Sequence, residues 1–102
     1  MQLTQIIASL NSFDDELCIV ARRPWTAEAE ARLVPLGDDG RIPAAALAEG
    51  YEYFLEVGVA IDEVIGELQG LSAEQRVALC IFYAENDAYP EWLNQAEPQR
   101  HQ

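Results

Sequence analysis

The sequence has no lysine, and its single histidine, His101, is the penultimate of 102 residues. Without lysine the chain cannot form a Schiff base with a carbonyl substrate, and it lacks the lysine of a phosphate-binding P-loop. A histidine-dependent triad would need His101 to act from a polar C-terminal segment, which does not hold a base rigidly against its nucleophile. We therefore predict no catalytic residue and a protein that is not an enzyme.

Metal-binding side chains other than carboxylates are equally few. Cys18 and Cys80 stand in the apolar runs 17–20 and 77–82, and together with His101 they lack the ligand spacing of a zinc site. Their surroundings predict buried, unpaired thiols, as is usual in a reducing cytoplasm. The acidic clusters do not match a calcium-binding loop, and we interpret them as solvated surface. We expect neither a metal nor a cofactor.

Positive charge is also scarce, since six arginines face 18 acidic residues and the formal net charge is -12. Such a surface repels a phosphate backbone, so we do not expect nucleic acid as a partner. No apolar run approaches the ~20 residues of a membrane span, and no basic residue precedes Arg22 as it would in a signal peptide. We expect a cytoplasmic protein without a membrane partner, whose charge favours a basic protein partner.

The apolar pattern predicts one α+β domain over residues 1–93, followed by a polar tail over 94–102. Predicted helices cover 3–10, 43–49, 61–68 and 73–85, and predicted strands cover 17–21, 27–34 and 51–59. A capping box, Ser72 with Gln75, marks the start of the last helix. The order α-β-β-(short α)-β-α-α predicts a small antiparallel three-stranded sheet with helices packed on one face.

Two of these strands depend on alternation. The segment 27–34 is ambiguous, because its composition favours a helix whereas its apolar residues alternate as in a strand; we choose a strand. In the strand 51–59, alternation places Tyr51, Tyr53 and Leu55 on one face.

Four short motifs occur in an order that resembles a known family. They are SFDDEL over 12–17, PW over 24–25, YFLEV over 53–57 and YAENDAY over 83–89. The chain resembles, over about residues 1–93, a family of small stand-alone bacterial proteins of unknown function. Small acidic proteins of this kind are similar to immunity proteins and to products of mobile gene cassettes. The resemblance implies no activity and no site residues.

Aromatic residues and neighbouring carboxylates supply the candidate site. Tryptophan and tyrosine bury much surface at little entropic cost, so they form pockets and interface anchors. The interface or pocket candidates are Trp25, Tyr51, Tyr53, Glu56, Asp87, Tyr89 and Trp92. We expect residues 89–93 to fold back over the domain as an aromatic clasp.

Three functions fit these observations. The first is a non-enzymatic interaction module, in its sharpest form an immunity- or antitoxin-like inhibitor of a basic protein. The second is a small-molecule-binding or catalytic domain with an aromatic and carboxylate pocket around Trp25, Glu56, Asp87, Tyr89 and Trp92. The third is a self-associating structural protein, a homodimer or larger, because 50% of the residues are apolar and the strand 51–59 could lie at a sheet edge.

Overall fold

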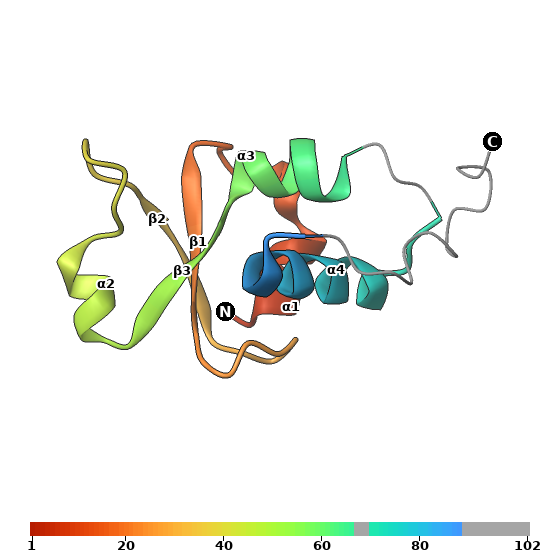
Figure 1. Ribbon diagram of the computed structural model, residues 1–102, viewed down its shortest axis with the longest axis horizontal. Coiled ribbons are helices and arrows are strands. Elements are labelled where there is room, and N and C mark those ends of the chain that lie inside the picture. Colours follow the sequence, from red (N-terminus) through yellow and green to blue (C-terminus); the bar gives the residue numbers. More distant parts are fainter. Residues whose placement is uncertain (67–69, 89–102) are drawn as a thin grey trace.

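Three antiparallel strands form the centre of the computed structural model, which describes residues 1–66 and 70–88 (Figure 1). Strand β1 (Leu17–Arg22) lies between β2 (Ala31–Pro35) and β3 (Tyr51–Glu56), so β2 and β3 are edge strands. The four middle residues of β1 are buried, as a short apolar run predicts for an inner strand. The predicted α+β fold with a small antiparallel sheet is confirmed.

Most helical residues lie on one face of the sheet (Figure 1). In the main core there, Leu3, Ile6, Val64 and Leu79 pack in one cluster with Phe54 of β3. These segments are helical because their apolar residues recur at helical spacing and so meet the sheet as one stripe. The elements on this face are α1 (Leu3–Ala8), the 3₁₀ turn η1 (Leu10–Ser12), α3 (Val57–Val59), the π-helix η2 (Ala60–Ile65) and α4 (Ala73–Asn86).

The short helix α2 (Ala44–Ala48) lies on the opposite face, which differs from the expectation of helices on one face only. Ala46 of α2 and Ile42 before it cover Cys18 and Val20 of β1 in a second, smaller core. A central strand that is apolar on both faces needs cover on both, and α2 supplies it on this side.

A bulge interrupts the pairing of β3 with β1. Val20 pairs with Tyr53 and Ile19 pairs with Leu55, which leaves Phe54 as an extra residue. Phe54 and Leu55 therefore both enter the main core, whereas Tyr53 stays on the face that α2 covers. The predicted alternation, with Tyr53 and Leu55 on one face, is wrong because a period of two does not survive an inserted residue.

Strand β3 also ends at Glu56, whereas the prediction extended it to residue 59. Val57 and Ala60 are fully buried at a spacing of three residues, which fits a helix better than a strand. The backbone N–H of Gly58 donates to the carbonyl oxygen of Asp15 at 2.9 Å, and a Cβ at Gly58 would lie 3.0 Å from that oxygen. This close approach explains a glycine at the point where the chain leaves the sheet.

The ambiguous segment 27–34 is a strand only from Ala31 onward. Residues 27–30 pair with the N-terminal end of the chain, since the N–H of Leu3 donates to the carbonyl oxygen of Ala29 at 2.8 Å. The strand prediction is therefore right for residues 31–34, which pair with β1.

Parts of the sequence predictions fall outside the described residues. The clasp over 89–93, with Tyr89 and Trp92, and the tail over 94–102 are among them. Within the described residues, no helix has the length and apolar character needed to cross a membrane.

Candidate docking surface around Tyr53

An open groove of about 950 Å³ lies between the loop after β2, helix α2 and strand β3. Leu36, Ile42, Leu47 and the ring of Tyr53 give it an apolar lining. Leu47 and Tyr53 are 55% and 44% exposed, which makes them two of the most exposed large hydrophobic side chains of the described chain. Exposed apolar surface of this kind marks interaction sites in soluble proteins.

Tight turns at both ends of α2 hold the groove open. The N–H of Gly40 donates to the carbonyl oxygen of Gly37 at 2.9 Å, and Gly40 has φ +78°, which a glycine adopts without strain. The N–H of Arg41 donates to Oδ1 of Asp39 at 3.0 Å, and this hydrogen bond closes the turn. After α2, Gly50 with φ +90° returns the chain into β3.

Tyr53 connects the groove to a carboxylate. Its hydroxyl donates to Oε2 of Glu56 at 3.1 Å. Partial burial, followed by this hydrogen bond, raises the pKa of Tyr53 to about 12. The phenol is therefore protonated at neutral pH, and it holds the carboxylate of Glu56 beside the ring.

Cys18 lies next to this pair, opposite Glu56 in the β1–β3 register. Burial and then the charge of Glu56 raise the pKa of Cys18 to about 12. A thiol with this pKa is not a thiolate at neutral pH and so does not act as a nucleophile. Tyr53 and Glu56 therefore present to a ligand a carboxylate, a hydrogen-bonded phenol and an aromatic face.

Tyr51 lies deeper on the same face of the sheet and is fully buried. The guanidinium carbons of Arg22 and Arg32 lie 4.7 and 4.8 Å from the centroid of its ring. Each arginine also pairs with a glutamate, Arg22 with Glu30 at 3.3 Å and Arg32 with Glu49 at 3.1 Å. Of the two predicted tyrosines that the structure describes, Tyr51 and Tyr53, only Tyr53 is therefore accessible to a partner.

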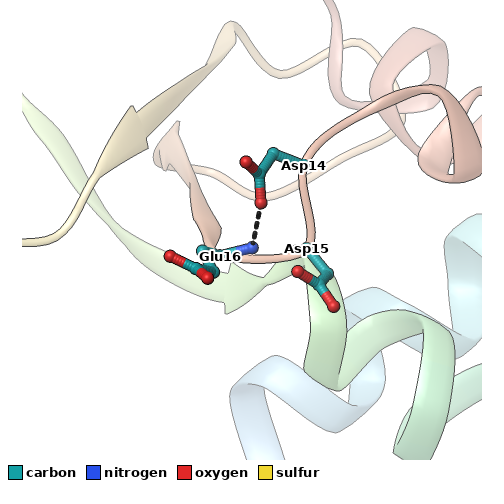
Figure 2. Close-up of side chains that lie close together, drawn as sticks. All are labelled: Asp14, Asp15 and Glu16. Atoms are coloured by element: carbon teal, nitrogen blue, oxygen red, sulfur yellow. Dashed lines mark hydrogen bonds between the residues drawn. The ribbon is translucent and has the colours of Figure 1, made fainter.

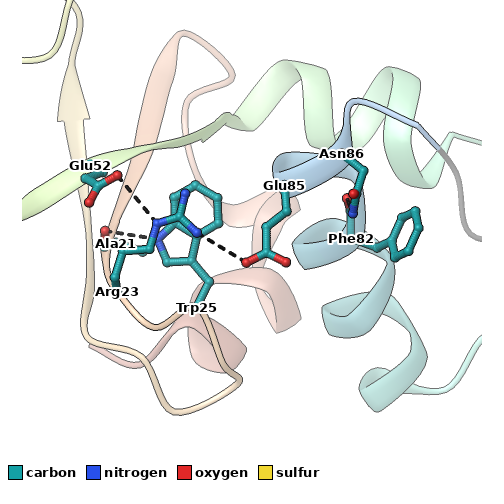
Figure 3. A network of polar contacts seen from close by, with 7 residues as sticks. All are labelled: Ala21, Arg23, Trp25, Glu52, Phe82, Glu85 and Asn86. Atoms are coloured by element: carbon teal, nitrogen blue, oxygen red, sulfur yellow. Dashed lines mark hydrogen bonds and ion pairs between the residues drawn. The ribbon is translucent and has the colours of Figure 1, made fainter.

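Trp25 belongs to the main core on the other face of the sheet and is 8% exposed. Its ring meets Phe54 edge-on at 5.0 Å, and its Nε1 donates to the carbonyl oxygen of Ala21 at 3.2 Å. The guanidinium of Arg23 covers the ring at 3.7 Å, as Figure 3 shows. Trp25 therefore packs in the main core and does not line the groove.

The aromatic and carboxylate pocket expected from the sequence is not assembled by its described members. Trp25 and Glu56 lie on opposite faces of the sheet. Asp87 is exposed at the C-terminal end of α4, where it adopts the left-handed conformation with φ 53°. Among the predicted site residues that the structure describes, it thus brings together only Tyr53 and Glu56.

A cluster of three acidic residues lies in the turn before β1 (Figure 2). One carboxylate oxygen from each of Asp14, Asp15 and Glu16 lies within 4.8 Å of the others, and all three side chains are exposed. Oδ1 of Asp14 accepts a hydrogen bond from the N–H of Glu16 at 2.9 Å, so this carboxylate stabilises its own turn. We assign no ligand to this cluster.

The sequence predicted the short helix at 43–49, which the structure confirms, but not the groove that this helix and the loop before it form. The available signal was Leu47, which follows Ala46 in a five-residue helix. Because Ala46 faces the sheet, its large apolar neighbour Leu47 is left on the solvent side.

No protein-family model, curated protein or solved structure matches this chain. The resemblance to a family of small bacterial proteins stays a prediction.

Proposed function

We propose that this protein is a non-enzymatic interaction module that docks a basic protein partner at the groove beside Tyr53. The observation that carries the proposal is the exposure of Leu47 and Tyr53 around an apolar groove of about 950 Å³. Desolvation of such a surface by a partner is favourable, at roughly 25 cal/mol per Å² of apolar area. Inhibition of the partner, as by an immunity protein or antitoxin, is the sharpest form of this function.

The charge of the protein supports a basic partner. The formal net charge is -12, and Asp39 and Glu52 line the groove. Among the described residues of that lining, Arg41 is the one cationic side chain, and it pairs with Asp39 at 3.9 Å. An apolar side chain flanked by arginine or lysine therefore fits this surface, and the overall field accelerates its approach.

The chemistry of Cys18, Cys80 and Tyr53 supports binding over catalysis. The pKa values of Cys18, Cys80 and Tyr53 are all raised to about 12. Catalytic nucleophiles and bases are tuned toward the working pH, whereas these groups are tuned away from it.

A random peptide library displayed on phage tests the proposal. We expect selected peptides to combine an apolar residue with arginine or lysine. Their affinity should fall at least tenfold for Leu47→Asp, because this change removes a large apolar side chain from the groove and puts there a carboxylate that binding would have to desolvate, a loss of at least ~1.4 kcal/mol. Phe82→Asp is the matched control, since Phe82 is 37% exposed on α4, outside the groove. Failure to enrich basic peptides, or equal affinity for Leu47→Asp, would contradict the proposal.

The volume of the groove also favours a second candidate function, the binding of a small apolar ligand. A volume of about 950 Å³ falls within the range of small-molecule sites. A thermal-shift screen of apolar metabolites separates the two functions. Stabilisation that disappears in Leu47→Asp, without enrichment of any peptide, would favour the small ligand.

A further inference from the structure

We infer that Tyr53 and Glu56 form a receptor for an arginine side chain of the partner, and that this receptor prefers a guanidinium to an ammonium group. The inference rests on the proposed function and deepens it, because it states which residue the partner places beside the groove.

The first support comes from the chain's own arginines on the same face of the sheet. Arg22 and Arg32 lie against the ring of Tyr51 at 4.7 and 4.8 Å. Each guanidinium simultaneously pairs with a carboxylate, Glu30 at 3.3 Å and Glu49 at 3.1 Å. Within this fold, two guanidinium groups therefore each contact the same tyrosine ring and pair with a glutamate of their own.

The same arrangement occurs on the other face. Arg23 lies over Trp25 at 3.7 Å and pairs with Glu52 at 3.5 Å and Glu85 at 3.2 Å (Figure 3). The guanidinium is held between an aromatic face and two carboxylates. All three aromatic–arginine contacts of the described residues therefore include a glutamate.

Tyr53 and Glu56 place these two chemical groups side by side, Tyr53 exposed and Glu56 half-buried. Tyr53 is 44% exposed, and its hydroxyl donates to Oε2 of Glu56 at 3.1 Å. The hydrogen bond holds the carboxylate next to the Tyr53 hydroxyl through Oε2, and Oε1 does not take part in that bond. A partner's side chain can therefore meet the aromatic face and the carboxylate together.

The preference for arginine follows from shape. A guanidinium is planar, so it can stack on the face of a ring while the N–H groups at its edge donate to a carboxylate beside the ring. An ammonium group is a compact, strongly hydrated charge that does not stack. Because Tyr53 also lines the apolar groove, the arginine should stand next to an apolar residue in the partner.

Nuclear magnetic resonance titration of the full chain tests the receptor directly. The probes are the N-acetyl N-methylamides of arginine and of lysine. We expect the arginine probe to shift the amide signals of Tyr53 and Glu56 and to bind more tightly than the lysine probe, by about two- to fivefold, the size of an exposed cation–π contact. Equal binding of the two probes, or shifts confined to another surface, would overturn the inference.

Three variants assign the effect to the two side chains. Tyr53→Leu keeps an apolar side chain without an aromatic face, and Glu56→Gln keeps the shape of the carboxylate without its charge. Each should weaken the arginine probe by about two- to fivefold. Glu28→Gln removes one exposed charge away from the groove and should leave binding unchanged. Unchanged binding in both Tyr53→Leu and Glu56→Gln would overturn the receptor.

The receptor and the docking function fail in different ways. If arginine binds at Tyr53 but the library yields no peptide, the docking function is contradicted and the receptor stands. If selected peptides depend on Leu47 but contain no arginine and bind Glu56→Gln normally, the docking function stands and the receptor is contradicted.

Discussion

At the scale of single residues, burial decides the chemistry of the two thiols. Cys80 is fully buried in α4, and burial alone raises its pKa to about 12. Cys18 reaches a similar value through burial together with the charge of Glu56. Both thiols are unpaired, as their apolar runs predicted.

The first prediction concerns the reactivity of these thiols. In the folded protein at pH 8, Cys18 and Cys80 should react with a disulfide reagent far more slowly than in denaturant, because neither forms a thiolate or meets solvent. The absorbance of the released thiolate, followed with and without denaturant, measures this. Single Cys→Ala variants assign each signal. Rapid reaction of one thiol in the folded protein would show that its burial is transient.

The same groups predict how stability depends on alkaline pH. Cys18, Cys80 and Tyr53 have raised pKa values in the folded state, so above pH 9 the unfolded chain loses its protons first. Their contribution is fully present below about pH 9 and is lost as pH rises toward about 12. Urea titrations at pH 8 and pH 10.5 should give a lower free energy of unfolding at the higher pH. The double variant Cys18→Ala with Cys80→Ala should reduce this difference, and an undiminished difference would contradict the assignment.

At the scale of elements, α4 owes its start to a reciprocal cap. The Ser72 hydroxyl accepts a hydrogen bond from the N–H of Gln75 at 3.1 Å, and the Gln75 side chain accepts one from the N–H of Ser72 at 2.9 Å. The sequence predicted this capping box, and the structure confirms it. Such a pair can be predicted from the sequence because both residues lie within one helical turn.

Loss of the Ser72 hydroxyl should therefore destabilise the start of α4. Ser72→Ala removes the acceptor and should lower the free energy of unfolding by ~1 kcal/mol. Ser9→Ala is the matched control, because Ser9 precedes η1 without a side-chain cap. Urea denaturation of the two variants gives the comparison. A cost at Ser72 no larger than that at Ser9 would show that packing alone sets the start of α4.

The features of the fold that were predicted wrongly share a physical cause, because each depends on contacts with residues distant in the sequence. The helical stripes and the apolar strand β1 were recognisable because their patterns are local. The bulge at Phe54 and the end of β3 depend instead on the pairing with β1 and on the contact between Gly58 and Asp15. The side of the sheet taken by α2 likewise depends on which face the other helices leave open.

The candidate site was predictable in its chemistry and not in its shape. Tyr53 and Glu56 were each candidates from the sequence, but strict alternation along 51–59 places them on opposite faces of the strand. The bulge at Phe54 brings them to the same face, where a hydrogen bond joins them. The groove could not be predicted, because tertiary contacts place Ile42 and Leu47 beside Tyr53. Trp25 was a candidate because it stands in a loop after proline, yet it packs against Phe54.

At the scale of the whole molecule, negative charge dominates. The described residues form five ion pairs, and every partner in them is at least 40% exposed. Exposed pairs contribute at most ~1 kcal/mol each, and salt screens them. A formal net charge of -12 therefore leaves repulsion among carboxylates as the larger electrostatic effect.

We accordingly expect moderate salt to stabilise the protein. The melting temperature should rise by about 2–4 °C between low and physiological ionic strength, which corresponds to roughly 0.5 kcal/mol in a domain of this size. The variant with Asp15→Asn and Glu16→Gln lowers the repulsion in the cluster of Figure 2 and should melt higher at low salt. A melting temperature that falls with salt would instead assign the larger role to the ion pairs.

The exposed edge of the sheet at β3 predicts self-association of the protein when the repulsion between two negatively charged copies is screened. The edge at β2 is partly covered, since Gln2 bridges to Glu30 just before the strand. Among the described residues, β3 pairs only with β1, and the exposed side chains of Leu47 and Tyr53 lie beside it. We propose that a second copy uses this same surface when no partner is bound.

Because each copy carries a formal charge of -12, association should increase as salt screens the repulsion between copies. Sedimentation velocity at high micromolar concentration should show a homodimer in physiological salt and a larger monomer fraction in low salt. Leu47→Asp should be monomeric at both, whereas Phe82→Asp should behave as the parent chain does. A basic peptide selected on the groove should displace the second copy, because both need Leu47 and Tyr53. A species of 11.4 kDa under all these conditions would exclude self-association and leave the groove to the basic partner alone.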